Sequence, residues 1–71
     1  MDWHSTQLRE ELIFAIDGRV RIECRDPIEQ SVSLSPGQCL FIPVRTRHRV
    51  INSSRVIARY VYVTASSVQR R

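Results

Sequence analysis

Hydrophobic and polar residues alternate along much of this chain, most clearly over residues 19–25. There Val20, Ile22 and Cys24 occupy one parity, and arginine or glutamate occupies the other. Because successive side chains of a strand point to opposite faces, this period of two predicts a strand with one buried face. Residues 31–35 and 48–52 alternate in the same way and predict two further strands.

Three other segments are apolar enough to form strands without strict alternation. Residues 10–17 contain Leu-Ile-Phe-Ala-Ile, whose β-branched and aromatic side chains favour a strand buried on both faces. Residues 38–42 predict a shorter apolar strand, and residues 55–64 predict the longest one. The side chains expected on one face of that last strand are Val56, Ala58, Tyr60 and Tyr62.

Turn residues separate these segments. Asp17-Gly18 stands between two apolar runs and predicts a hairpin. Ser35-Pro36-Gly37 predicts a tight turn, because proline presets φ and glycine tolerates positive φ. Pro43 ends the strand before it, since proline cannot donate to a ladder. About six short strands and no helix signal predict an all-β fold, an antiparallel barrel or sandwich.

The length of 71 residues predicts a single domain over residues 1–71 with a small core. A domain of this size buries only about 60% of the surface that its unfolded chain exposes, and such domains often complete their core by association. We therefore expect a homodimer. No apolar run is long enough for a membrane span, and the first residues lack the pattern of a signal peptide. The expected location is the cytoplasm.

Net charge is +4, and all the basic residues are arginines. A small basic protein raises the hypothesis of nucleic-acid binding. The arginines alternate with apolar residues, however, which is typical of the solvated face of a strand. Aromatic residues are not interleaved with them as a base-stacking platform requires, and we expect them in the core or an interface. They are Trp3, Phe14, Phe41, Tyr60 and Tyr62.

The two cysteines, Cys24 and Cys39, lie far apart in strand-like runs without metal-type spacing. Free cysteine is among the most buried residue types. We expect two buried free thiols rather than a disulfide.

Two groups of residues carry a family resemblance. Gly37, Pro43, His48 and Asn52 are spaced as in the second motif of the cupin superfamily, with Arg45 where that motif has a second glycine. Upstream, Glu11 and Gly18 are spaced as in the first cupin motif. With a four-residue spacer His4 falls on its first histidine and Thr6 on its second. The chain resembles a small single-domain cupin, which implies a minimal RmlC-like jelly-roll barrel or sandwich. Because family members carry additional strands before the first motif, we expect one end of the barrel to be open or closed by a partner chain.

The resemblance also implies a metal centre. Cupins commonly hold a divalent metal with three histidines and a glutamate, and here His4, Glu11 and His48 remain. Two imidazoles and one carboxylate suit iron(II), and manganese, nickel or zinc fit the same set. The alternative is a site without metal, because Thr6 replaces one ligand.

Glu11 and His48 are also the expected catalytic pair, since a carboxylate facing an imidazole can transfer protons. Arg47 and Arg49 flank His48 and are expected to attract an anionic ligand, or else to form a solvated loop or a dimer contact. We expect a protein that binds a small, anionic molecule, as a non-catalytic binding or sensing module or as a metal-dependent dioxygenase or isomerase. A basic barrel that binds nucleic acid ranks last. Fold alone does not choose between enzyme and binder.

Overall fold

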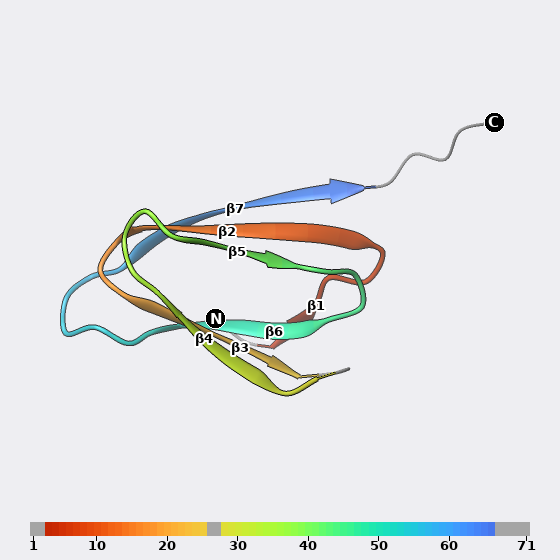
Figure 1. Cartoon of the computed structure of the whole chain (residues 1–71), viewed down its shortest axis with the longest axis horizontal. Helices are drawn as coiled ribbons and strands as arrows, with labels where there is room; N and C mark the ends of the chain where they lie inside the picture. Colours follow the sequence, from red (N-terminus) through yellow and green to blue (C-terminus); the bar gives the residue numbers. More distant parts are fainter. Residues whose placement is uncertain (1–2, 26–27, 67–71) are drawn as a thin grey trace.

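A computed structural model describes residues 3–25 and 28–66, which form two antiparallel sheets (Figure 1). The four-stranded sheet has the order β1-β6-β3-β4, and the three-stranded sheet has the order β5-β2-β7. The strands are β1 (His4–Ser5), β2 (Arg9–Asp17), β3 (Val20–Arg25), β4 (Gln30–Leu34), β5 (Cys39–Ile42), β6 (Arg47–Asn52) and β7 (Arg59–Ser66). The described residues contain no helix long and apolar enough to span a membrane.

The predicted all-β antiparallel architecture is confirmed as a sandwich, because the two sheets are not closed into a barrel. Only β3 and β4 are consecutive strands of one sheet, and every other connection between the described strands crosses to the opposite sheet. This crossing pattern places residues that are distant in sequence on facing inner surfaces. The core between the sheets consists of Ile13, Ala15, Val20, Ile22, Leu34, Ile42 and Val50.

The hairpin predicted at Asp17-Gly18 is wrong. β2 pairs with β5 and β7, whereas β3 pairs with β4 and β6, so this turn carries the chain from one sheet to the other. Gly18 has φ +69°, and a Cβ there would lie 2.9 Å from the Cα of Ala58. The glycine is required for both the backbone conformation and the close contact.

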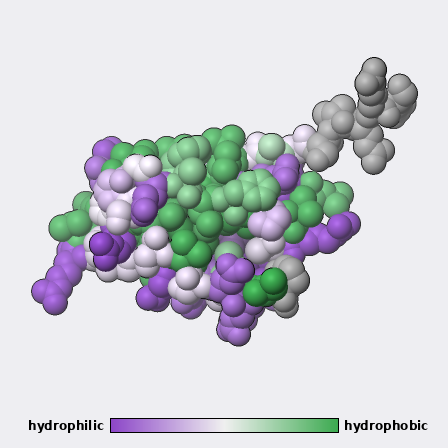
Figure 2. Space-filling view, in the orientation of Figure 1, coloured by the Kyte–Doolittle hydropathy of each residue, from purple (hydrophilic) through white to green (hydrophobic). Residues whose placement is uncertain are grey.

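The outer faces of the two sheets differ in character. On the three-stranded sheet, Leu12 pairs with Phe41 and Val63, and Phe14 pairs with Val61, all on the side away from the core. We call Leu12, Phe14, Phe41, Val61 and Val63 the outer apolar face. Residues 10–17 were predicted to be buried on both faces. That prediction is wrong for a single copy of the chain, since Phe14 is 39% exposed. In Figure 2, hydrophobic side chains dominate the part of the surface where β2 and β5 run, and hydrophilic ones extend along the four-stranded sheet.

Two strand boundaries also differ from expectation. β7 begins at Arg59 rather than at residue 55, because the segment before it turns, with Val56 and Ile57 exposed. β1 was not predicted, since two residues are too short for a recognisable period. Both cysteines are free as predicted, but the expected burial is wrong for Cys39, which is exposed on the outer side of β5, and Cys24 is only half-buried. A prediction of a frayed tail over residues 65–71 is wrong for Ala65 and Ser66, which are paired in β7; residues 67–71 lie outside the described part.

Candidate functional site

Glu11 lies on the inner face of β2, in line with the core residues Ile13 and Ala15. The alternation that buries those two side chains buries Glu11 as well, leaving it 5% exposed. Its neighbour Glu10 points the other way and is half-buried. Glu11 is thus the carboxylate that faces the interior, which the sequence alone left undecided.

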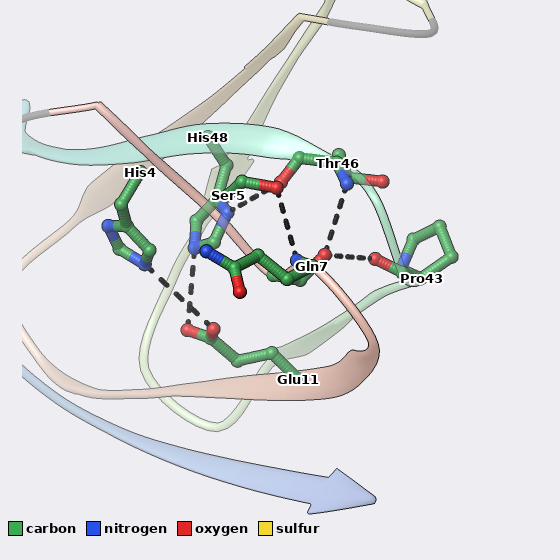
Figure 3. Close-up of polar contacts among 8 residues, drawn as sticks. His4, Ser5, Gln7, Glu11, Pro43, Thr46 and His48 are labelled. Carbon is green, nitrogen blue, oxygen red and sulfur yellow. Dashed lines mark hydrogen bonds and ion pairs between the residues drawn. The ribbon is translucent and has the colours of Figure 1, made fainter. Parts of the chain in front are cut away.

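Two histidines approach this carboxylate from the opposite sheet (Figure 3). His48 of β6 is fully buried, and its Nε2 lies 3.4 Å from Oε1 of Glu11. His4 of β1 pairs directly with His48, and its Nε2 lies 4.0 Å from the other carboxylate oxygen. The two imidazole rings meet edge to face with centroids 4.2 Å apart. One potential ligand atom from each residue lies within 4.8 Å of the others.

The hydrogen bonding of His48 decides which of its nitrogens is free. Nδ1 lies 3.3 Å from the carbonyl oxygen of Thr46, which can only accept, so Nδ1 carries the hydrogen in this contact. In the neutral imidazole, Nε2 then presents a lone pair to the Glu11 carboxylate. Among the described residues this buried atom has no hydrogen-bond partner, because the 3.4 Å approach to Glu11 does not have hydrogen-bond geometry. In that tautomer two electron-rich atoms face each other at a buried position, an arrangement that a cation between them stabilises.

This donor set fits a divalent first-row metal. Two imidazoles and one carboxylate leave open positions for a ligand or water, and a histidine that donates its other N–H to a carbonyl is the usual arrangement at metal sites. His4, Glu11 and His48, all expected as ligands, are thus brought together by β1, β2 and β6. The geometry also suits the alternative role of Glu11 and His48 as an acid/base pair.

Thr6, which occupies the place of a family histidine, has a different role. Its hydroxyl donates to the Pro43 carbonyl at 2.8 Å and accepts from the Thr46 N–H at 3.0 Å. Its own N–H donates to the Thr46 carbonyl at 3.1 Å. The segment before β2 is thereby joined to the segment before β6. Sequence reasoning treated Thr6 only as a lost ligand, because the partner loop is 37 residues or more away along the chain.

Arg45 and Gln7 complete this junction. Both adopt left-handed backbone, with φ of 55° and 54°, and the Arg45 N–H donates to the Gln7 carbonyl at 2.7 Å. The family's glycine position is therefore a left-handed position in this chain too, occupied by an exposed arginine.

The structure does not bring Arg47 and Arg49 into the cluster. They alternate with His48 along β6 and point to the outer face of the four-stranded sheet. There Oε1 of Glu23 lies 2.7 Å from Nε and 2.6 Å from Nη2 of Arg49 and accepts from this guanidinium group. Arg49 and Arg25 both stack on the indole of Trp3, with guanidinium carbons 4.7 Å and 4.1 Å from the ring centroid. This stack could not be predicted from the sequence, because three separate segments contribute to it.

A cavity of about 210 Å³ opens beside the cluster, between β3 and β4 of one sheet and β5 of the other. Its lining includes Ile42, which pairs with Glu11, and Thr46, which contacts His48. The remaining lining residues, none of them charged, are Cys24, Ile28, Gln30, Val32, Leu40, Phe41 and Pro43.

Two ionisable groups, one lining the cavity and the other interacting with Glu11, stay neutral at ordinary pH. Burial raises the pKa of the Cys24 thiol, so it contributes a small apolar surface rather than a thiolate. Burial, together with Tyr62 and Glu11, raises the pKa of the Tyr60 hydroxyl on the inner face of β7. Neither side chain adds a charge to the site.

Comparison with known proteins is consistent with this geometry. The family model for the cupin domain matches residues 1–64. A similar solved structure is the crystal structure of Drosophila melanogaster CENP-C bound to CAL1, with a TM-score of 0.83 and 13% sequence identity. The alignment covers 92% of this chain and 55% of the other, so the chain spans about half the length of that protein. At this identity the likeness shows the fold alone. No curated protein matches the sequence significantly.

Proposed function

This chain belongs to the cupin family, and from that premise we propose that it binds a divalent metal through His4, Glu11 and His48 and a small molecule in the adjacent cavity. The observation that carries the proposal is the buried Nε2 atom of His48, which lacks a hydrogen-bond partner and lies 3.4 Å from a buried carboxylate. A metal ion uses both groups at once, and His4 supplies a third donor.

When bound, such a metal supplies Lewis-acid polarisation or, for a redox-active ion, oxygen chemistry at its open positions. The residues of the chain have simpler tasks. Thr46 orients the His48 imidazole, and Glu11 balances the charge of the ion. In the metal-free alternative, Glu11 and His48 are instead the groups that accept a proton from a bound ligand or return it.

The cavity indicates the kind of ligand. Its lining carries no charged side chain among the described residues, and a dry apolar cavity of about 150 Å³ is large enough for benzene. We therefore propose a ligand with an apolar body the size of a single ring. The anionic group expected from the sequence would approach the metal rather than Arg47 and Arg49, which lie on the opposite face of β6.

Metal analysis tests the first part of the proposal. Protein purified without chelator or nickel resin should bind about one equivalent of Zn²⁺ or Fe²⁺ in calorimetric titration, and His48→Ala should bind at least 10-fold more weakly. Glu10→Gln is the matched control for Glu11→Gln, because the two carboxylates are adjacent and only Glu11 faces the site. Less than a tenth of an equivalent in the unmutated protein would contradict the metal centre.

Glu11→Gln also separates the metal site from a metal-free acid/base pair. Without metal, the substitution removes a buried charge and should leave stability unchanged or raise it. With Zn²⁺ at 100 times its dissociation constant, the unmutated protein should gain about 2.7 kcal/mol while Glu11→Gln gains almost nothing. Equal gains in both proteins would place the metal elsewhere.

The ligand class is tested with benzoate as the probe, observed by chemical-shift changes in ¹H–¹⁵N spectra. Shifts should concentrate on Val32, Leu40 and Ile42, and Leu40→Phe should abolish them by filling the cavity. Acetate, which lacks the ring, is the control. Equal responses to acetate and benzoate would contradict an apolar binding cavity.

We also propose a homodimer that pairs the outer apolar face of two copies. The face is formed by three strands and remains exposed, with Phe41 51% and Val63 50% accessible. Contiguous apolar surface of this kind typically marks an interface, and a second copy presents a surface of the same character. Sedimentation should give about twice the 8.3 kDa chain mass, and Val61→Arg should yield monomers. A stable monomer at about 50 μM would overturn the proposal, because obligate apolar interfaces remain associated at that concentration.

A further inference from the structure

Of the three proposed ligands, His4 is held in place by the fewest contacts of its own strand. It lies on a strand of only two residues, at the edge of the four-stranded sheet, where β1 pairs with no described strand other than β6. Its side chain is 43% accessible, whereas those of Glu11 and His48 are buried. Little in β1 itself holds the imidazole near the carboxylate, so its position depends on the residues on either side.

Two anchors flank His4. On one side, Trp3 lies on the outer face of the sheet and stacks on the guanidinium groups of Arg25 and Arg49. Arg49 is itself held by Glu23, so the platform under the indole is fixed. Cation–π contacts of this type are stabilising by about 0.5–1 kcal/mol each at exposed sites.

On the other side, Thr6 is buried and takes part in three hydrogen bonds with the segment that leads into β6. The same segment contains Thr46, whose carbonyl orients the His48 imidazole. Thr6 thus ties the strand that carries one histidine to the loop that positions the other. Figure 3 shows this junction beside the three potential ligands.

We propose that residues Trp3–Thr6 form a latch, and that Trp3 and Thr6 are positioning residues that set metal affinity without touching the metal. The proposal rests on the metal centre proposed above. When the latch is docked, three ligands are available, and when it is undocked, Glu11 and His48 remain as two. Metal binding therefore favours the docked latch, and by reciprocity a weakened latch lowers metal affinity.

The chain contains one tryptophan, so its fluorescence reports on the latch directly. Zn²⁺, which has a closed d shell, should increase the fluorescence anisotropy of Trp3 as it binds. His4→Ala should still bind Zn²⁺ weakly through the other two ligands, but without the anisotropy change. Binding is followed independently by calorimetry, which does not depend on the tryptophan.

Weakening either anchor should lower Zn²⁺ affinity by about 5- to 50-fold, within the usual range of coupling between sites. Trp3→Ala and Thr6→Val test the two anchors, and Trp3→Phe should fall between Trp3→Ala and the unmutated protein because its ring still accepts the guanidinium groups. Leu8→Ala is the control, because Leu8 lies just beyond the latch and is 70% exposed. Trp3 is on the outer surface, so Trp3→Ala should remain folded even if Thr6→Val does not.

A double-mutant cycle separates positioning from a general structural effect. In the His4→Ala background, Trp3→Ala should no longer change Zn²⁺ affinity, since the histidine that it positions is gone. Thr6→Val should keep only the smaller part of its effect that acts through Thr46 on His48. Losses of equal size with and without His4 would overturn the latch. An unmutated protein that binds Zn²⁺ with no Trp3 response and no effect of either anchor variant would overturn this inference alone. No Zn²⁺ binding at all would overturn both this inference and the metal centre.

Discussion

The crossings at Gly18 and at Arg45 make equivalent connections at opposite ends of the sandwich (Figure 1). Each carries the chain from the three-stranded to the four-stranded sheet, and each has a residue in left-handed backbone, with φ of 69° and 55°. Both positions match glycines of the cupin motifs, yet only the first is a glycine here. The difference lies in what surrounds them.

At Gly18 an added Cβ would lie 2.9 Å from the Cα of Ala58 and 2.9 Å from the carbonyl oxygen of Ile57, both of them backbone atoms. Arg45 is exposed, and its N–H donates to Gln7 across the junction. Position 18 requires glycine for space as well as for φ, whereas at position 45 glycine is favoured only by φ. A family motif can therefore lose one of its glycines and keep the fold.

Gly18→Ala should have the largest effect. A side chain in left-handed backbone costs about 1–2 kcal/mol, and forcing a methyl group into a filled space costs about 1–3 kcal/mol more. The sum is comparable with the stability of many small domains. Urea unfolding should therefore show a loss of at least about 2 kcal/mol at unchanged slope. A loss below about 1 kcal/mol would mean that the segment of Ile57 and Ala58 yields easily.

Asn52→Ala should have the next largest effect at the same end. The Asn52 side chain donates to the Val56 carbonyl at 2.8 Å and accepts from the Ser54 N–H at 2.9 Å, which shapes the loop that presses on Gly18. Losing these exposed bonds should cost about 1 kcal/mol. Because the loop then yields, the double variant Gly18→Ala/Asn52→Ala should lose less than the sum of the two single losses. Strict additivity in urea unfolding would disprove this coupling.

Arg45→Gly should act in the opposite direction. Glycine adopts φ of about 55° without the strain that a Cβ imposes, although it adds entropy to the unfolded chain. The expected net result is a gain of about 1 kcal/mol or slightly less in the free energy of unfolding. Arg45→Ala, which removes the charge and keeps the Cβ, is the matched control and should give no gain. A loss of stability in Arg45→Gly would show that the arginine side chain itself contributes to the junction.

Gln7→Gly should have the smallest effect. Gln7 has φ of 54° and is exposed, but it also lies next to Thr6 in the latch. The relief of backbone strain, about 1 kcal/mol, is offset by greater freedom of the undocked segment. Stability should therefore change by less than about 0.5 kcal/mol. A loss above about 1 kcal/mol would show that the left-handed strain here is small.

Much of the strand pattern could be predicted, because alternation depends only on which residues face the core. The segments of β3, β4 and β6 were recognised from Val20, Ile22, Val32 and similar positions. Which strands pair could not be predicted locally. Asp17-Gly18 has the composition of a hairpin turn, but the pairing of β2 with β7 and of β3 with β6 is decided by contacts across the whole domain.

The candidate site was predicted in composition but not in orientation. His4, Glu11 and His48 follow from motif spacing, whereas the inward direction of Glu11 and the outward direction of Arg47 and Arg49 follow from the register of β2 and β6. Residues that are adjacent in sequence point to opposite faces of a strand. The support from Trp3 and Thr6 was not predictable, because their partners come from distant segments.

The outer apolar face has a consequence for how this domain responds to dilution. If folding and pairing are coupled, stability follows mass action, so the melting temperature rises with protein concentration. Two samples of the same sequence, tenfold apart in concentration, would then melt at different temperatures although no bond within the chain has changed. In that case the concentration of the chain would contribute to the stability of this small domain, in addition to the residues of its core.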